Sequence, residues 1–267
     1  MSSPSSPSSH EARRLDWDAC YNARDVGGYP LAGGGRTRWG RFFRADNLRR
    51  LSARGRAALL ASGVRTVIDL RSPFELGIDP YPFPPGASAG GDSGLPAYRN
   101  LPVLDPADAA EAAALAGAAT VEAMYAAMLA HGRARLGAIL RAVAAAPAGG
   151  VLVYCHAGKD RTGLVTALVL AVAGAAPPDV AADYAVSGGY LRPWYAEQVR
   201  RVPDAAARVR LARSLRSPLN ATRPESMRAT LAHLDRSYGG PEAYLAGAGV
   251  ADAELAALRR RIVEAPA

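Results

Sequence analysis

The clearest hydrophobic pattern in the chain is a short apolar run and a longer one, separated by a polar segment. Residues 151–154 are continuously apolar and include two valines, which predicts a buried strand. Residues 164–172 are apolar over a length that favours a helix, which should end at Gly174, ahead of Pro177-Pro178. Residues 155–163 between them are small or polar. The pattern therefore predicts a strand, a tight loop and a helix in direct succession.

Further runs predict other strands and helices around this unit. Strands are expected at 36–44, 64–70 and 98–104. A helix is expected at 53–61, with Ser52 as its N-cap and Gly63 at its end. The alanine-rich stretch 107–146 should be helical with breaks near Gly117 and Gly132. Further helices are expected from Pro178 to a break at Gly188-Gly189, and at 225–238 and 252–263. This alternation predicts a single α/β domain: a short, mainly parallel sheet wrapped by helices, with the polar loop between a central strand and a helix.

The polar loop has the composition of an anion-binding site. Backbone N–H groups of His156, Ala157 and Gly158 lie just before a helix N-terminus, where they can point at one oxyanion while the helix dipole adds positive charge. Arg161 lies in the first helical turn and supplies a planar fork for two oxygens. Thr162 follows it and adds a hydroxyl. We therefore interpret the loop as a phosphate-binding loop.

The same surroundings act on Cys155, which begins the loop. Inward N–H groups, an arginine and a helix N-terminus should lower the pKa of a thiol below its free value of about 8.5. The expected product is a thiolate aimed at a bound phosphorus atom, which is a nucleophile. The spacing Cys155-x5-Arg161 followed by Thr162 is the signature of cysteine-dependent phosphatases.

Lysine usage also points to this loop. The chain holds 32 Lys and Arg residues, and its one lysine is Lys159. An ammonium group is a compact point charge, unlike a guanidinium, so we expect a specific requirement for lysine at this position. His156 would add a second cation that suits multiply phosphorylated ligands.

The loop resembles that of one bacterial family, the tyrosine-phosphatase-like proteins with the sequence Cys-x-Ala-Gly-Lys-Asp-Arg-Thr-Gly. Four further segments resemble motifs of the same family, namely 22–29, 43–48, 68–72 and 238–245. The likeness runs from about residue 15 to residue 263. Two positions depart from the family pattern: Tyr154 precedes the cysteine where His is common, and Ala23 replaces a Phe.

The resemblance implies a protein-tyrosine or dual-specificity phosphatase that works through a phosphocysteine intermediate and needs no metal or cofactor. Cys155 would attack phosphorus, and Arg161 would hold the equatorial oxygens as charge shifts. Thr162 could donate its hydroxyl to the departing thiolate. The expected partners are phosphorylated proteins or phosphoinositides, because some relatives cleave both. In some relatives, helices in the region of residues 190–217 cover the site as a lid.

The sequence leaves the general acid open between two aspartates. Asp160 lies inside the loop beside Arg161, and the resemblance ties this residue to catalysis. An aspartate among so many donors would normally stay ionised, which argues against it as the acid. Asp105 follows the expected strand 98–104, a position similar to that of the acid in dual-specificity phosphatases. Asp69 and Arg71, at the end of another strand, are expected to form a structural salt bridge.

Composition narrows the partners and the compartment. The net charge of +8 favours acidic ligands such as phosphoesters, and the chain has neither a basic block interleaved with aromatics nor a nucleic-acid-binding motif. Its two cysteines give no disulfide framework, and the histidines show no metal spacing. Residues 1–14 are expected to be a disordered Ser/Pro tail before a phosphatase domain at 15–267. No run has the character of a signal peptide or a membrane span, so we expect a cytoplasmic protein, with signal-independent secretion still open.

Three alternatives stay beside the leading interpretation. The first is a phosphoinositide phosphatase with the same mechanism. The second is a phospholigand-binding module without turnover, against which the complete set Cys155, Asp160, Arg161 and Thr162 argues. The third is a sulfurtransferase, which would not require Arg161 six residues after the cysteine.

Overall fold

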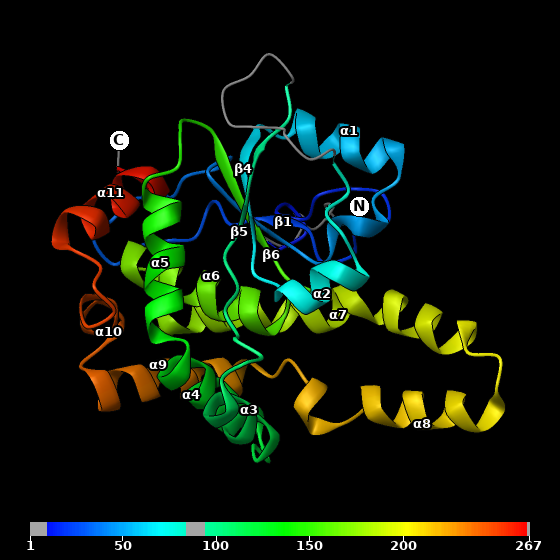
Figure 1. Ribbon diagram of the computed structural model, residues 1–267. Helices are drawn as coiled ribbons and strands as arrows, with labels where there is room; N and C mark the ends of the chain where they lie inside the picture. Colours follow the sequence, from blue (N-terminus) through cyan, green and yellow to red (C-terminus); the bar gives the residue numbers. More distant parts are fainter. Residues whose placement is uncertain (1–9, 84–93, 266–267) are drawn as a thin grey trace, which may run out of the picture.

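A five-stranded sheet carries the polar loop at the end of its central strand (Figure 1). The computed structural model describes residues 10–83 and 94–265. The strand order is β1 (Arg24–Asp25), β3 (Phe42–Ala45), β6 (Gly150–Tyr154), β4 (Val64–Asp69) and β5 (Ala97–Asn100). β1 is antiparallel to β3, and the other neighbours are parallel. Two more strands, β2 (Arg36–Thr37) and β7 (Val263–Glu264), form a separate antiparallel pair.

Helices pack against both faces of this sheet. The larger core lies against α4 (Val121–His131), α5 (Arg133–Ala144), α6 (Asp160–Ala173), α7 (Pro177–Arg201), α9 (Pro224–Tyr238), α10 (Pro241–Ala246) and α11 (Asp252–Ile262). The smaller core, on the opposite face, includes α1 (Ala53–Ala61) and the 3-10 helix η1 (Leu48–Arg50). The remaining elements are α2 (Pro73–Ile78), α3 (Ala109–Ala116), α8 (Ala205–Leu215) and η2 (Pro218–Asn220). The predicted single α/β domain with a mainly parallel sheet is confirmed.

The central strand β6 contributes to both cores because successive side chains of a strand point to opposite faces. Val151 and Val153 lie in the larger core, and Leu152 and Tyr154 lie in the smaller one. All four side chains are fully buried. Burial of each of the three aliphatic side chains among them contributes about 1.5–3 kcal/mol, so the strand that precedes the loop is held from both sides.

Most predicted elements agree with the structure. The strand at 151–154 is β6, and the following helix is α6, which ends at Gly174 in the left-handed conformation. Ser52 caps α1 through a hydrogen bond from the N–H of Gly55. The alanine-rich stretch forms three helices with ends at Gly117 and Gly132, as predicted. The strand expected at 98–104 is shorter and ends at Asn100.

The strand predicted at 36–44 is wrong as one element. β2 and β3 occupy this stretch, and they belong to different sheets. Gly40, with φ +71, lies between them in a conformation that other residues rarely adopt. The apolar alternation continues through the bend, so the pattern alone does not show it.

The break predicted at Gly188-Gly189 is also wrong, since α7 runs through both glycines. A Cβ atom at Gly188 would lie 2.2 Å from the hydroxyl of Thr222. The glycine therefore permits close approach of another segment and does not end the helix. The segment 190–217 consists of the second half of α7 followed by α8, and the two helices lie side by side (Figure 1).

The described part of the chain begins before the predicted boundary at residue 15. Arg13 is buried and donates from Nε to the carbonyl of Gly27 at 2.7 Å, and Arg14 forms a bridge with Arg24 of β1. Residues 10–14, predicted to be part of a disordered tail, thus pack on the domain. The tail prediction for residues 1–9 lies outside the described residues. Within the described ranges, no helix combines the length and apolarity needed to cross a membrane.

Candidate active site

The loop from Cys155 to Lys159 joins the end of β6 to the start of α6 and fits tightly against β3. Gly158 has φ +64, and a Cβ atom there would lie 2.4 Å from the carbonyl oxygen of Ala45. Only glycine satisfies both the left-handed backbone and the close contact. The sequence pattern marked this residue for its backbone N–H group, and the structure adds a steric reason for it.

Three consecutive carbonyl groups of the loop are bonded on its outer side. The carbonyl of His156 accepts from the N–H of Asn47 at 3.0 Å. The side-chain amide of Asn22 donates to the carbonyls of Ala157 and Gly158, each at 3.0 Å. In a trans peptide the C=O and N–H groups point in opposite directions. Anchoring these carbonyls therefore turns the N–H groups of residues 157–159 to the other side, as the predicted phosphate-binding loop requires.

A buried charge cluster completes this anchoring. Arg44 donates to the carbonyl of Gly158 at 2.6 Å and forms an ion pair with Asp183 of α7. Arg24 pairs with the same carboxylate at 2.9 Å and donates to Asn22 Oδ1 at 2.6 Å. Burial alone would raise the pKa of Asp183, but the charges of Arg24 and Arg44 outweigh burial and hold that pKa far below its usual range. Asp183 thus fixes both arginines behind the loop, a role that no sequence pattern indicated.

Arg161 is oriented by Glu75 of α2, a residue to which the sequence analysis gave no role. The two side chains form a bidentate ion pair, with Nη1 to Oε2 at 2.5 Å and Nη2 to Oε1 at 2.7 Å. This contact uses one N–H of each terminal nitrogen and leaves the Nε–H and two further N–H groups for a ligand. Burial would raise the pKa of Glu75, but Arg161 lowers it to about 2. In turn Glu75 and the Cys155 sulfur raise the pKa of Arg161 against the effect of burial.

Glu75 is itself held by the first turn of its helix. Its carboxylate accepts from the backbone N–H of Ser72 at 2.9 Å, and the Ser72 hydroxyl accepts from the N–H of Glu75. This capping box is visible in the sequence as Ser72-x-x-Glu75. The sequence therefore contained a signal at Glu75, but this signal indicates the start of a helix and not an ion pair with a distant arginine.

Tyr154, where relatives often have His, connects the end of β6 to the same helix. Its hydroxyl donates to the carboxylate of Asp69 and accepts from Arg71 at 3.0 Å. Asp69 and Arg71 are buried and paired at 2.6 Å, so the predicted structural salt bridge is confirmed. Arg71 also donates to the carbonyl of Asp79 at the end of α2, at 2.7 Å. The tyrosine is therefore a hydrogen-bonded support between the loop and the helix that carries Glu75.

The remaining loop side chains have distinct surroundings. Cys155 is 2% exposed and Thr162 is fully buried. Within the described residues the Thr162 hydroxyl has no hydrogen-bond partner. The His156 ring contacts Trp194 of α7 at 5.5 Å between centroids. Partial burial, together with Arg50, lowers the pKa of His156, which disfavours the second cation that we expected there.

Asp160 and Lys159 form a polar cluster at the helix start. Asp160 Oδ1 accepts from the hydroxyl of Tyr125 at 2.7 Å and lies 3.4 Å from the Lys159 ammonium. Lys159 is 2% exposed and also donates to the carbonyl of Leu219 at 3.3 Å. The Tyr184 hydroxyl lies 2.8 Å from that of Tyr125. One carboxylate oxygen of Asp160 is thus held by the protein.

Asp105 lies outside this cluster. It is exposed, and its carboxylate accepts from the N–H of Ala107 at 3.0 Å in the turn before α3. Its own N–H donates to Glu111 at 2.7 Å. These contacts are local, whereas Asp160 is part of the loop. A search of the described ranges finds no group of three or more His, Cys, Asp or Glu side chains that could hold a metal ion.

Comparison with known proteins agrees with this geometry. The sequence profile described as the tyrosine phosphatase family matches residues 15–264. The chain belongs to the tyrosine phosphatase family. It is 31% identical to the triple specificity protein phosphatase PtpB of Mycobacterium tuberculosis, over 90% of this chain and 95% of the relative. It is 30% identical to a tyrosine-protein phosphatase of Nostoc commune, over 84% and 74% of the two chains.

A third relative is a putative tyrosine-protein phosphatase of Cupriavidus necator, 29% identical over 91% of this chain and 86% of the relative. The predicted family and the predicted enzyme class, a phosphatase, are confirmed. A cysteine-dependent mechanism is general to this family, which agrees with the strand–loop–helix unit that carries Cys155.

Replacing Glu75 by Gln should slow the phosphatase and reduce its stability in a pH-dependent way. Without the carboxylate, Arg161 loses its fixed orientation, and kcat should fall about a hundredfold. The folded pKa of about 2 lies below the ordinary 4.5, so the ion pair stabilises fully above pH 4.5 and this contribution is lost as the pH falls toward 2. Urea unfolding at pH 7 and pH 3 measures this.

The stability difference between wild type and Glu75→Gln should therefore be smaller at pH 3 than at pH 7. Glu225→Gln is the matched control, because its carboxylate is exposed and forms an i, i+3 ion pair with Arg228 at 3.6 Å. A difference that stays constant with pH would contradict the role of the ion pair.

Replacing Asp183 by Asn should destabilise the phosphatase by about 3–5 kcal/mol, because Arg24 and Arg44 would stay buried without a counter-charge. Asp204→Asn, at an exposed helix cap 4.0 Å from Arg210, should change stability by less than about 0.5 kcal/mol. Urea unfolding at pH 7 compares the two. A loss below about 1 kcal/mol for Asp183→Asn would show that the cluster does not need this carboxylate.

Proposed function

We propose that this phosphatase hydrolyses phosphotyrosine and phosphoserine/threonine in proteins through a phosphocysteine intermediate. The observation that supports this most is that the Arg161 guanidinium is held by a bidentate ion pair with Glu75 and is also affected by the negative charge of Cys155. The names of the relatives, tyrosine-protein phosphatase and triple specificity protein phosphatase, point to the same substrates. A free catalytic thiol suits a reducing compartment, so we place the protein in the cytoplasm.

In the first step, the Cys155 thiolate attacks phosphorus and a sulfur–phosphorus bond forms as the ester oxygen leaves. The N–H groups of the loop and the free N–H groups of Arg161 bind the equatorial oxygens, where negative charge gathers. In the second step, water attacks phosphorus, the sulfur–phosphorus bond breaks and phosphate leaves. The buried hydroxyl of Thr162 is available to donate to the returning thiolate.

The leaving oxygen takes a proton in the first step, and we assign this proton to Asp160. Its position in the loop supports the assignment, as does the Tyr125 hydroxyl, which holds Oδ1 and so orients the carboxyl group. Lys159, 3.4 Å away, also contacts the carboxyl group, which would accept a proton from water in the second step. Asp105 remains the competing candidate.

The nucleophile can be tested with p-nitrophenyl phosphate in EDTA, with and without vanadate. Cys155→Ser should abolish turnover but keep tungstate binding, because the loop amides and Arg161 remain. Cys20→Ser, a thiol that hydrogen-bonds Asp46 outside the loop, should keep wild-type activity. Turnover near the wild-type rate in Cys155→Ser would rule out the phosphocysteine mechanism.

The general acid can be identified by the basicity of the leaving group. A true acid changed to Asn should slow phosphotyrosine hydrolysis at least about tenfold more than p-nitrophenyl phosphate hydrolysis, since nitrophenolate leaves without a proton. It should also remove the alkaline limb of the kcat/KM profile. We expect this pattern for Asp160→Asn and near wild-type values for Asp105→Asn. Equal losses on both substrates for Asp160→Asn would assign it a positioning role only.

A further inference from the structure

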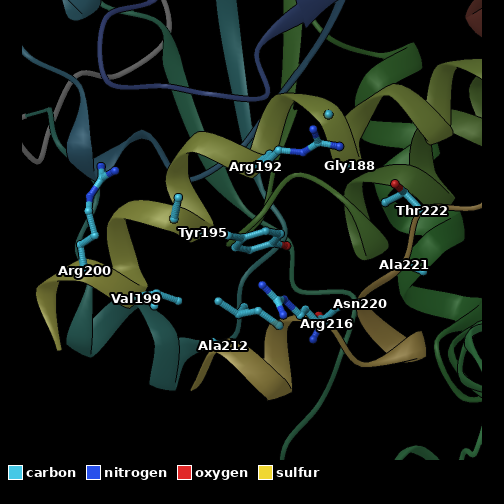
Figure 2. A pocket seen from close by; sticks show the side chains of 13 residues that line it. Gly188, Arg192, Tyr195, Val199, Arg200, Ala212, Arg216, Asn220, Ala221 and Thr222 are labelled. Atoms are coloured by element: carbon cyan, nitrogen blue, oxygen red, sulfur yellow. The ribbon is translucent and has the colours of Figure 1, made fainter. Parts of the chain in front are cut away.

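A groove runs between α7 and α8 and continues to η2 (Figure 2). Its volume is about 780 Å³. Small and apolar side chains form its walls, with Val199 on α7 and Ala212 on α8 facing each other across it. Tyr195 and Arg216 extend toward one another between the two helices, and Asn220 lies at the η2 end. We call this space the α7–α8 groove.

The α7–α8 groove lies beside the phosphate-binding loop. Tyr195 lines the groove, and burial raises its pKa to about 12, with the negative charges of Asp160 and Cys155 acting in the same direction. The neighbouring Trp194 contacts His156 of the loop. At the η2 end, Lys159 donates to the carbonyl of Leu219, the residue before Asn220. A substrate whose phosphate occupies the loop would therefore extend into this groove.

The charge of the groove has one sign. Arg216 extends between the two helices, and Arg192 and Arg200 border the groove from α7, with the Arg200 side chain directed away from α8 (Figure 2). No acidic side chain among the described residues borders it. None of the three takes part in an ion pair within residues 10–83 and 94–265. Arginines elsewhere on the same helices do have partners, since Arg201 pairs with Glu197 and Arg210 with Asp204. The unpaired cations thus gather where a substrate would lie.

We propose that the α7–α8 groove binds the segment of a phosphoprotein next to the phosphorylated residue, and that it selects acidic side chains there. The proposal rests on the proposed function and adds a substrate preference to it. Arg192 and Arg200 are eight residues apart on one helix, about 12 Å at 1.5 Å per residue. An extended peptide covers that length with about four residues at 3.3 Å each. Acidic residues within about four positions of the phosphoresidue would meet these cations.

The shape of the groove favours a single extended chain over a lipid surface. The apolar walls and Arg216 lie between two helices, where a peptide can enter and a flat bilayer cannot. Aliphatic parts of the peptide would cover Val199 and Leu215, while carboxylates reach the arginines at the edges. Exposed ion pairs of this kind give selectivity more than affinity.

The test compares kcat/KM for three phosphotyrosine peptides that carry Glu, Gln or Lys at the flanking positions. Wild type should prefer the Glu peptide. The double variant Arg200→Gln/Arg216→Gln should lose about fivefold on the Glu peptide, the effect of two exposed ion pairs, and keep its rate on the Gln peptide and on p-nitrophenyl phosphate. The matched control is Arg201→Gln/Arg213→Gln, which removes the same net charge from the same helices outside the groove.

Peptide binding to Cys155→Ser, measured by fluorescence anisotropy, repeats the comparison without turnover. An equal loss in the control double variant, or no preference for Glu over Gln in wild type, would overturn the proposal. A loss confined to phosphoinositide in phosphatidylcholine vesicles would overturn it in favour of a lipid ligand. Failure of the proposed function would instead appear as no turnover of p-nitrophenyl phosphate by wild type.

Discussion

The active site depends on the outward anchoring of the loop carbonyls. A peptide unit that offers its N–H group to a phosphate turns its C=O group to the other side, where a buried carbonyl needs a partner. Asn22, Arg44 and the backbone of Asn47 supply those partners at successive units. Asp183 makes this possible, because its carboxylate pairs with both buried arginines behind the loop. The loop conformation is therefore set by residues from the first strands and from α7, far away in the chain.

The orientation of Arg161 depends on a second group of contacts that begins at Tyr154. The tyrosine hydroxyl joins Asp69 and Arg71, and Arg71 binds the end of α2, whose first turn holds Glu75. A histidine at this position would reach fewer of these partners, since its ring is shorter than a phenol. Tyr154, which departs from the family pattern, thus has its own buried hydrogen-bond network, and Cys155 is preceded by a residue held by several partners.

The sequence was sufficient to predict those parts of the candidate site whose residues are neighbours in the chain. It was insufficient for the parts that depend on residues far apart in the chain. Cys155, Arg161 and the strand–loop–helix unit lie within a few positions of one another, so spacing predicts them. Glu75 and Asp183 gave no comparable signal, because a capping glutamate and a helical aspartate have many ordinary uses. Gly188 misled for a related reason: its lack of a side chain serves a contact with Thr222, 34 positions further along the chain, which no local pattern contains.

The single lysine shows how the loop and the α7–α8 groove are linked. The Lys159 ammonium is nearly inaccessible and lies between the Asp160 carboxylate and the Leu219 carbonyl. A guanidinium is larger and planar, so an arginine here would push against η2 or turn away from Asp160. Asp160 also accepts a hydrogen bond from the Tyr125 hydroxyl. The Tyr125 hydroxyl contacts that of Tyr184, which donates to the carbonyl of Ala221 at the end of the groove. The residues that hold Asp160 and those that border the groove thus share one hydrogen-bonded cluster, and a compact cation at its centre is compatible with both.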